Sequence, residues 1–265
     1  MPDPSKALFY FMPLVYDVLH EPGTAAEVRG LSRIARRFVT SKPSAARTWL
    51  EPACGTGRYL RAAARHGIRT IGFDLAPEMV SYAKSRVPSA DIFRATMQRF
   101  ARHVPKASVG FAFNMINTIR HLPSDRAMLE HFRDIARVLA PGGVYVVGIS
   151  LTNYGNEIPT EDVWIGKRGA MQVRQVVQYL PPESRRGPRA RHEACICHMT
   201  ITKRSGKRVE EEDLDFTYHL RCYNLEQWYK LLERSPLRVL ATIDERGKDL
   251  PPAEPGYSIF VLTAR

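Results

Sequence analysis

Short apolar runs alternate with segments of helical periodicity through the middle of this chain. Strands are predicted at the β-rich apolar runs 47–50, 70–73, 91–95, 109–115 and 144–149. Helices are predicted between them at about 57–66, 77–86 and 124–139. The helix at 124–139 is expected to end at Pro141-Gly142-Gly143, which turns into the next strand. Such alternation predicts a parallel sheet with right-handed crossovers.

The pattern differs on both sides of this region. Two helices are predicted before it, at about 5–19 and 24–39, with Thr24 as the N-cap of the second and Pro43 beyond its end. After position 150 strands follow one another without helices, at 170–180, 193–203 and 208–220, and residues 204–207 predict a tight turn. The chain then closes with a predicted helix at 224–234 and strands at 237–243 and 257–263. We therefore divide the chain into residues 1–42, 43–150, 151–222 and 223–265.

The charge balance leaves a nucleic-acid partner open without favouring it. The formal net charge is +12, with 39 Lys and Arg among 265 residues, but arginine is spread along most of the chain. Two local concentrations occur, one on a predicted helix face and one in a loop: Arg29, Arg33, Arg36 and Arg37, and Arg185, Arg186, Arg189 and Arg191. A solvated basic surface is the favoured interpretation of both.

Cysteine usage and hydropathy narrow the class of protein. Four cysteines are too few for a disulfide scaffold at this length. The cluster His192, Cys195, Cys197 and His198 lacks zinc spacing, so no metal site is expected. No stretch reaches the ~20 apolar residues of a membrane helix, and the N-terminal segment lacks the features of a signal peptide. We expect no membrane association and a cytoplasmic location.

A strand, a glycine turn and a helix follow one another at the start of the alternating region. Gly55 and Gly57 permit a tight turn and close approach of a ligand, and the following helix start offers free N–H groups to an anion. The next strand ends in Asp74, where a carboxylate can accept hydrogen bonds from a ribose diol. A nicotinamide fingerprint would need glycine in place of Leu60 and does not require Glu51, which disfavours an oxidoreductase.

These motifs resemble those of class I S-adenosylmethionine-dependent methyltransferases. Glu51-Pro-Ala-Cys-Gly-Thr-Gly57 is similar to the family's first motif, with Ala53 at a usual glycine position, and Gly72-Phe-Asp-Leu-Ala-Pro-Glu-Met79 is similar to the second. The resemblance implies an α/β, Rossmann-like, mostly parallel seven-stranded sheet with helices on both faces, an N-terminal helical cap and an antiparallel β insertion that forms a lid. It also implies S-adenosyl-L-methionine as cofactor and S-adenosyl-L-homocysteine as product. The implied cofactor-binding residues are Tyr16, Glu51, Ala53, Cys54, Gly55, Gly57, Arg58, Asp74, Leu75, Met79, Thr96, Met97, Asn114 and Met115.

Two later positions depart from the family pattern. Thr96 stands where an acid near the adenine is usual, and Gly110 stands where many members have Asp. Both departures keep open a cofactor-binding protein without catalysis.

The reaction does not require a protein nucleophile, because the cofactor supplies the leaving group of an in-line displacement. His121 is a candidate general base, and the resemblance suggests that Tyr16 closes over the cofactor. Loop and packing roles remain open for both side chains. Candidate acceptor contacts are Tyr10, Asn117, His121, Arg221 and Tyr223, and Trp164 and Tyr179 face either the pocket or the core.

A small-molecule acceptor is favoured by the predicted lid over the sheet. An RNA or protein methyltransferase remains the alternative, since the chain is basic, although it has neither Asn-Pro-Pro-Tyr nor Asp-Pro-Pro-Tyr. The sequence does not define the acceptor atom or the oligomeric state.

Overall fold

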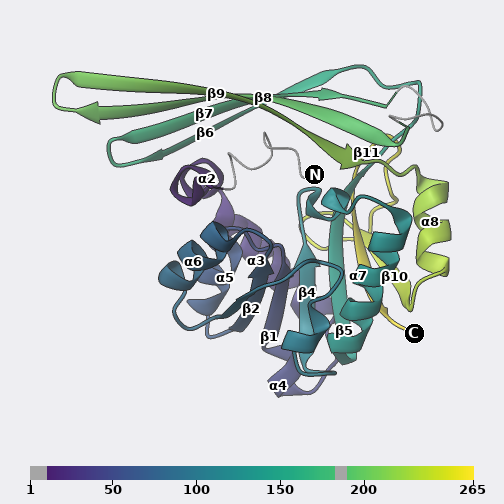
Figure 1. Cartoon of the computed structure of the whole chain (residues 1–265). Helices are drawn as coiled ribbons and strands as arrows, with labels where there is room; N and C mark the ends of the chain where they lie inside the picture. The colour runs from purple at the N-terminus through teal and green to yellow at the C-terminus, as the bar shows by residue number, and fades with distance from the viewer. Residues whose placement is uncertain (1–10, 183–189) are drawn as a thin grey trace.

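A seven-stranded sheet forms the centre of the protein, whose computed structural model describes residues 11–182 and 190–265 (Figure 1). The strand order is β10-β11-β5-β4-β1-β2-β3. The five parallel strands are β1 (Thr48–Pro52), β2 (Arg69–Asp74), β3 (Asp91–Arg94), β4 (Val109–Asn114) and β5 (Leu139–Leu151). At one edge β11 (Gly256–Ala264) pairs antiparallel with β5 on one side and with β10 (Leu237–Ile243) on the other. The predicted mostly parallel α/β sheet is confirmed.

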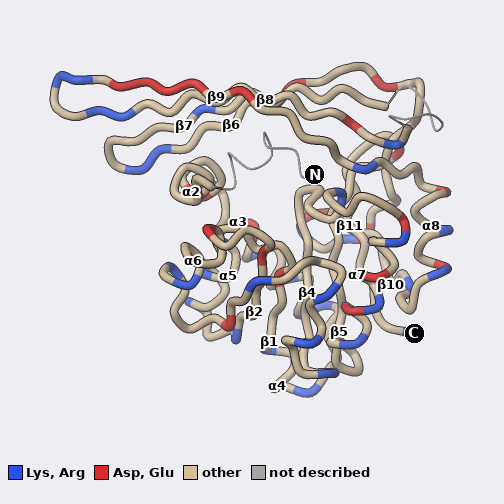
Figure 2. The backbone as a smooth tube through the Cα atoms, in the orientation of Figure 1, with Lys and Arg blue, Asp and Glu red and all other residues tan. Residues whose placement is uncertain are grey.

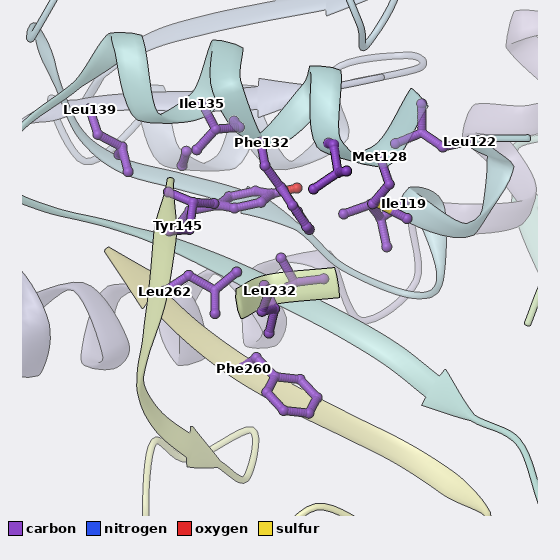
Figure 3. Packing of buried hydrophobic residues seen from close by; sticks show 14 of the residues in the cluster. Ile119, Leu122, Met128, Phe132, Ile135, Leu139, Tyr145, Leu232, Phe260 and Leu262 are labelled. Carbon is purple, nitrogen blue, oxygen red and sulfur yellow. The ribbon is translucent and has the colours of Figure 1, made fainter. Parts of the chain in front are cut away.

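Helices cover both faces of this sheet because alternate strand residues point to opposite sides. On β4, Phe111 and Phe113 enter one apolar cluster and Ala112 enters the other. Figure 3 shows the second cluster, where Phe132 packs close to Tyr145. The helices are α3 (Thr24–Phe38), α4 (Pro43–Ala46), α5 (Arg58–Ala64), α6 (Pro77–Arg86), α7 (Asp125–Val138) and α8 (Leu225–Glu233), with short 3-10 turns η1 (Ala101–His103) and η2 (Thr118–His121).

A separate antiparallel sheet, which we call the lid, lies across the top of the core in Figure 1. Its strands are β6 (Thr160–Arg168), β7 (Met171–Leu180), β8 (His192–Ser205) and β9 (Arg208–Arg221), in that order. The predicted strands after position 150 and the turn at 204–207 are confirmed, whereas β6 was not predicted. Figure 2 shows Lys and Arg at the hairpin tips of the lid and a run of acids along β9. Because β6 alternates poorly between polar and apolar residues, its sequence carried little strand signal.

Helix α2 (Pro13–His20) packs against β6 and β7, between the lid and the core. It confirms the later part of the helix predicted at 5–19, whose first residues lie outside the described part. No helix in the described ranges has the length and apolarity needed to span a bilayer.

Pro43 lies beyond the end of α3, as predicted, and begins α4, because proline suits the first turn of a helix. Two local predictions are wrong in detail. The N-cap of α3 is Gly23, and Thr24 is the first helical residue, whose hydroxyl donates back to the carbonyl of Glu21 at 2.7 Å. Residues 141–143 lie inside β5, which already starts at Leu139. The four-part division at 42, 150 and 222 stays a prediction.

Candidate functional site

The glycine loop after β1 is held in left-handed backbone geometry at alternate residues. Ala53, Gly55 and Gly57 have φ of 52°, 53° and 71°. Only glycine adopts such angles without cost, so Ala53 is the strained member of the series. The loop is tied to the end of β2 by a hydrogen bond from the Gly55 N–H to Oδ2 of Asp74, at 2.9 Å. The predicted glycine turn and the predicted acid are thus brought together.

Asp74 is buried at the tip of β2, and its second carboxylate oxygen accepts the N–H of Ala76 at 2.9 Å. Burial raises the pKa of Asp74, while the N–H groups of Ala76, Gly55 and Leu75 offset part of that effect. These bonds fix the orientation of the carboxylate, and its remaining lone pairs are available to a ligand hydroxyl. Leu75 beside it is 61 % exposed, as a residue that packs on a ligand would be, whereas Met79 is fully buried.

Glu51, at the end of β1, carries a buried carboxylate oxygen that lacks a partner. Its Oε2 has no hydrogen bond within the described part of the chain. Burial raises the pKa of Glu51 well above its ordinary value, an effect that Arg58 opposes and that Asp74 adds to. Because unsatisfied buried polar atoms are costly, this oxygen favours a bound donor. An amino-acid ammonium group fits the oxygen, so the residues present suit the amino-acid tail of S-adenosylmethionine.

A cavity of about 160 Å³ opens beside this loop and is walled by four parts of the chain. Its lining includes Glu51, Ala53, Cys54 and Arg58 from the core, Tyr16 and His20 from α2, Met115, Asn117 and His121 near η2, and Trp164, Gln175, Tyr179 and Tyr218 from the lid. The structure therefore places Tyr16, Asn117 and His121, all predicted site residues, around one hollow.

Tyr16 covers the glycine loop. A Cβ atom built on Gly55 would lie 3.5 Å from its ring carbon Cε1. Burial raises the pKa of Tyr16 to about 12, with Arg58 opposing the shift, so its hydroxyl stays protonated at neutral pH. His20, one turn further along α2, lies 4.4 Å from Tyr16 between ring centroids. His20 was not predicted, although its i, i+4 spacing from Tyr16 was a usable signal.

A larger cleft of about 960 Å³ adjoins the cavity. Six residues line both hollows: Tyr59, Met115, Ile116, Asn117, Trp164 and Tyr179. We call this set the junction. Trp164 and Tyr179, for which the sequence left a pocket or a core position open, belong to the junction and therefore face the pocket and not only the core.

The turn after β4 builds one side of the junction. Ile116 and Asn117 are consecutive left-handed residues, with φ of 51° and 62°. Tyr257 accepts the Ile116 N–H at 3.0 Å, and the Asn117 amide exchanges hydrogen bonds with Ser150. A strained turn held by such partners is typical of functional sites.

Other predicted cofactor residues are engaged within the protein. Arg58 is buried, and its guanidinium donates to Glu27 at 2.7 Å, to Thr24 at 2.8 Å and to the Tyr59 hydroxyl at 2.6 Å. Arg58 lines the cavity, and its predicted cofactor-binding role stays a prediction.

The Asn114 amide lies within the sheet. Its Nδ2 donates to the Pro52 carbonyl at 2.7 Å, and its Oδ1 accepts from Tyr145 at 2.6 Å. Thr96 is exposed and Met97 half-buried on the loop after β3. A cofactor role for these three residues stays a prediction.

The predicted acceptor contacts Arg221 and Tyr223 line neither the cavity nor the cleft. Tyr223 is 0 % exposed and belongs to the core, where it packs on Trp228. Arg221 donates to Asp125 at 2.9 Å. Both lie where the lid rejoins the core, since the Arg221–Asp125 pair fastens β9 to α7. Tyr10 lies outside the described residues, as do Arg185, Arg186 and Arg189.

Gly110 lies at the opposite end of β4 from the junction. A Cβ atom there would meet the backbone of α4, with the Ala45 carbonyl oxygen at 2.5 Å. Close packing therefore explains why glycine stands at this position, and the absence of an acid here is not evidence against catalysis.

Comparison with known families agrees with this geometry. Residues 50–143 match the model of a family described as a methyltransferase domain. This segment is therefore similar to a methyltransferase domain.

The matched segment has curated relatives among enzymes named as sugar N,N-dimethyltransferases. One is the dTDP-3-amino-3,4,6-trideoxy-alpha-D-glucopyranose N,N-dimethyltransferase of Streptomyces venezuelae, 28% identical over 123 residues, covering 46% of this chain and 49% of the relative. Another is the dTDP-3-amino-3,6-dideoxy-alpha-D-glucopyranose N,N-dimethyltransferase of Streptomyces fradiae, 31% identical over 133 residues, covering 50% and 51%. The matched region spans about half the length of these relatives.

Solved methyltransferase structures share the whole fold. DesVI of Streptomyces venezuelae superposes with a TM-score of 0.69 at 22% identity, covering 95% of this chain and 96% of DesVI. CalS10 of Micromonospora echinaspora, an amino pentose methyltransferase solved with S-adenosylmethionine, gives 0.64 at 20% identity, covering 90% and 92%. The likeness extends the fold assignment beyond the matched domain to the lid and the last strands.

Proposed function

We propose that this protein transfers the methyl group of S-adenosylmethionine to a small-molecule nucleophile. The observation that carries the proposal is the junction, where a cavity beside the glycine loop meets a cleft large enough for an acceptor. A sulfonium methyl group on one side and a nucleophile on the other would face each other there.

The cofactor supplies the activated methyl group and the leaving group. The protein's own task is to bind both molecules, align them and exclude water, which supplies up to about 7–11 kcal/mol of barrier reduction. Asp74 would accept hydrogen bonds from the ribose diol, and Glu51 from the amino group of the methionyl part. Tyr16 would cover the cofactor from above the glycine loop, with Leu75 and Met79 near the adenosine.

We infer that the acceptor atom is an amine nitrogen. The relatives are named N,N-dimethyltransferases of amino sugars, and an alkylamine is protonated at neutral pH, so it needs a base before it can attack. His121 lines the cavity, with its ring 5.7 Å from that of Tyr218. A neutral imidazole can accept such a proton.

A catalytically silent cofactor-binding protein is the second candidate, supported now by Thr96 alone, since packing accounts for Gly110. The basic surface keeps a nucleic-acid acceptor possible without favouring it. A cytoplasmic location is also part of our proposal.

The test is turnover with methyl-labelled cofactor and two extracts, one of small metabolites and one of RNA. We expect labelled product and S-adenosylhomocysteine only with the metabolite extract. Cofactor binding without turnover in either extract would favour the silent protein, and label in RNA would favour the nucleic-acid alternative. His121→Ala should then lower kcat with little change in the Kd of S-adenosylhomocysteine.

A further inference from the structure

One buried carboxylate joins three walls of the cavity. Asp17 on α2 is 0 % exposed. Its Oδ1 accepts the hydroxyl of Thr56, in the middle of the glycine loop, at 2.9 Å. Its Oδ2 accepts the guanidinium of Arg168, at the end of lid strand β6, at 2.7 Å. Asp17 therefore contacts the cofactor loop and the lid with its two oxygens.

Further donors complete the site. Arg61 of α5 lies 3.3 Å from Oδ1 of Asp17, and the Tyr82 hydroxyl of α6 donates to Oδ2 at 3.0 Å. Glu21, the C-cap of α2, also pairs with Arg61 and Arg168. Burial opposes ionisation, but the donors outweigh it and hold the pKa of Asp17 below its ordinary value. The carboxylate is thus charged and fully engaged.

The lid docks against α2 by backbone contact as well. A Cβ atom on Gly166 would lie 1.9 Å from the carbonyl oxygen of Val18. Only glycine allows strand β6 to come so close to the helix. Two independent features, a side-chain network and a glycine contact, therefore set the position of β6.

That position matters for the site because the same elements carry cavity residues. Trp164, four residues before Arg168 on β6, belongs to the junction. Tyr16, next to Asp17 on α2, covers the glycine loop. Neither Asp17 nor Arg168 lines the cavity or the cleft, so both act on the site through their neighbours.

We propose that Asp17 is a positioning residue that fixes α2 and the lid onto the cofactor loop, so that cofactor binding and lid placement are energetically coupled. The inference rests on the proposed function for the identity of the cofactor. Binding in the loop orders Thr56, which through Asp17 orders Arg168 and the lid. By reciprocity, weakening the lid contact weakens cofactor binding.

The test is a double-mutant cycle read out as the Kd of S-adenosylhomocysteine by calorimetry. Thr56→Val removes the loop contact and Arg168→Gln removes the lid contact. Each single variant should raise Kd about tenfold. The Kd of the double variant should be no higher than the Kd of the weaker-binding single variant, because both changes act through the same carboxylate. The matched control is Lys167→Gln, which removes a charge from the adjacent exposed position of β6 and should leave Kd unchanged.

A second readout follows the lid itself. In the wild type, S-adenosylhomocysteine should slow amide hydrogen exchange in β6; in Arg168→Gln it should slow exchange only in the glycine loop. If Arg168→Gln does not fold by thermal melting, Arg168→Lys keeps the charge but not the paired donors, and its Kd should lie between those of wild type and Thr56→Val.

Two results would overturn the inference: an Arg168 variant that is folded and binds like wild type, or single-variant effects that multiply in the double variant. Failure of the proposed cofactor assignment looks different, because then the wild type itself would not bind S-adenosylhomocysteine.

Discussion

Replacing Asp74 with asparagine tests the cofactor site with the smallest change in shape. In the structure both carboxylate oxygens accept backbone N–H groups at 2.9 Å, from Gly55 and Ala76. Asparagine has one oxygen, which can keep the bond to Ala76. Its amide nitrogen would then face the Gly55 N–H, donor against donor, so the glycine loop loses its attachment to β2.

The expected size follows from these contacts. A hydrogen bond to a charged acceptor contributes about 1.5–3 kcal/mol. Losing the one to Gly55 therefore raises the Kd of S-adenosylhomocysteine by roughly 10- to 150-fold. Loss of the negative charge facing the ribose diol acts in the same direction.

Calorimetric titration of S-adenosylhomocysteine measures this change, with a thermal melt to show that each variant is folded. Asp91→Asn is the matched control, because Asp91 pairs with Arg69 on the exposed surface of β3, where ion pairs contribute little. A folded Asp74→Asn variant that binds with wild-type affinity would refute the assignment of this carboxylate to the cofactor site.

Three further predictions concern other parts of the fold. Burial lowers the pKa of His131 from 6.5 to about 4; the unfolded chain then binds a proton that the folded chain does not, so the free energy of unfolding should fall by about 1.4 kcal/mol per pH unit from pH 6.5 towards 4. In urea denaturation at several pH values, the free energy of unfolding of His131→Gln should depend on pH less steeply by that amount. An unchanged pH dependence would contradict the assignment. Gly110→Ala should cost about 1–3 kcal/mol of stability through its clash with α4 yet leave the cofactor Kd unchanged; weaker binding would return Gly110 to the site. Tyr257→Phe removes the hydroxyl that accepts the Ile116 N–H. It should raise the KM of the methyl-acceptor substrate more than the KM of the cofactor, and equal effects on both KM values would argue against a role at the junction.

The sequence by itself determined the parallel sheet and the cofactor loop. Both depend on local information: apolar periodicity defines the strands, and Gly55, Gly57 and Asp74 stand at fixed distances from strand ends. Because carboxyl ends of neighbouring parallel strands share one edge of a sheet, local motifs alone placed these residues together.

Only the tertiary structure decided what covers that edge. Asp17 and Arg168 are 151 positions apart, and no local pattern connects them. The same limit explains the error at Tyr223: a residue beside a strand end can face the pocket or the core, and packing against Trp228 places it in the core. Contacts between distant segments depend on how the lid docks, which is set by the summed burial and pairing of many residues and not by the spacing of a few.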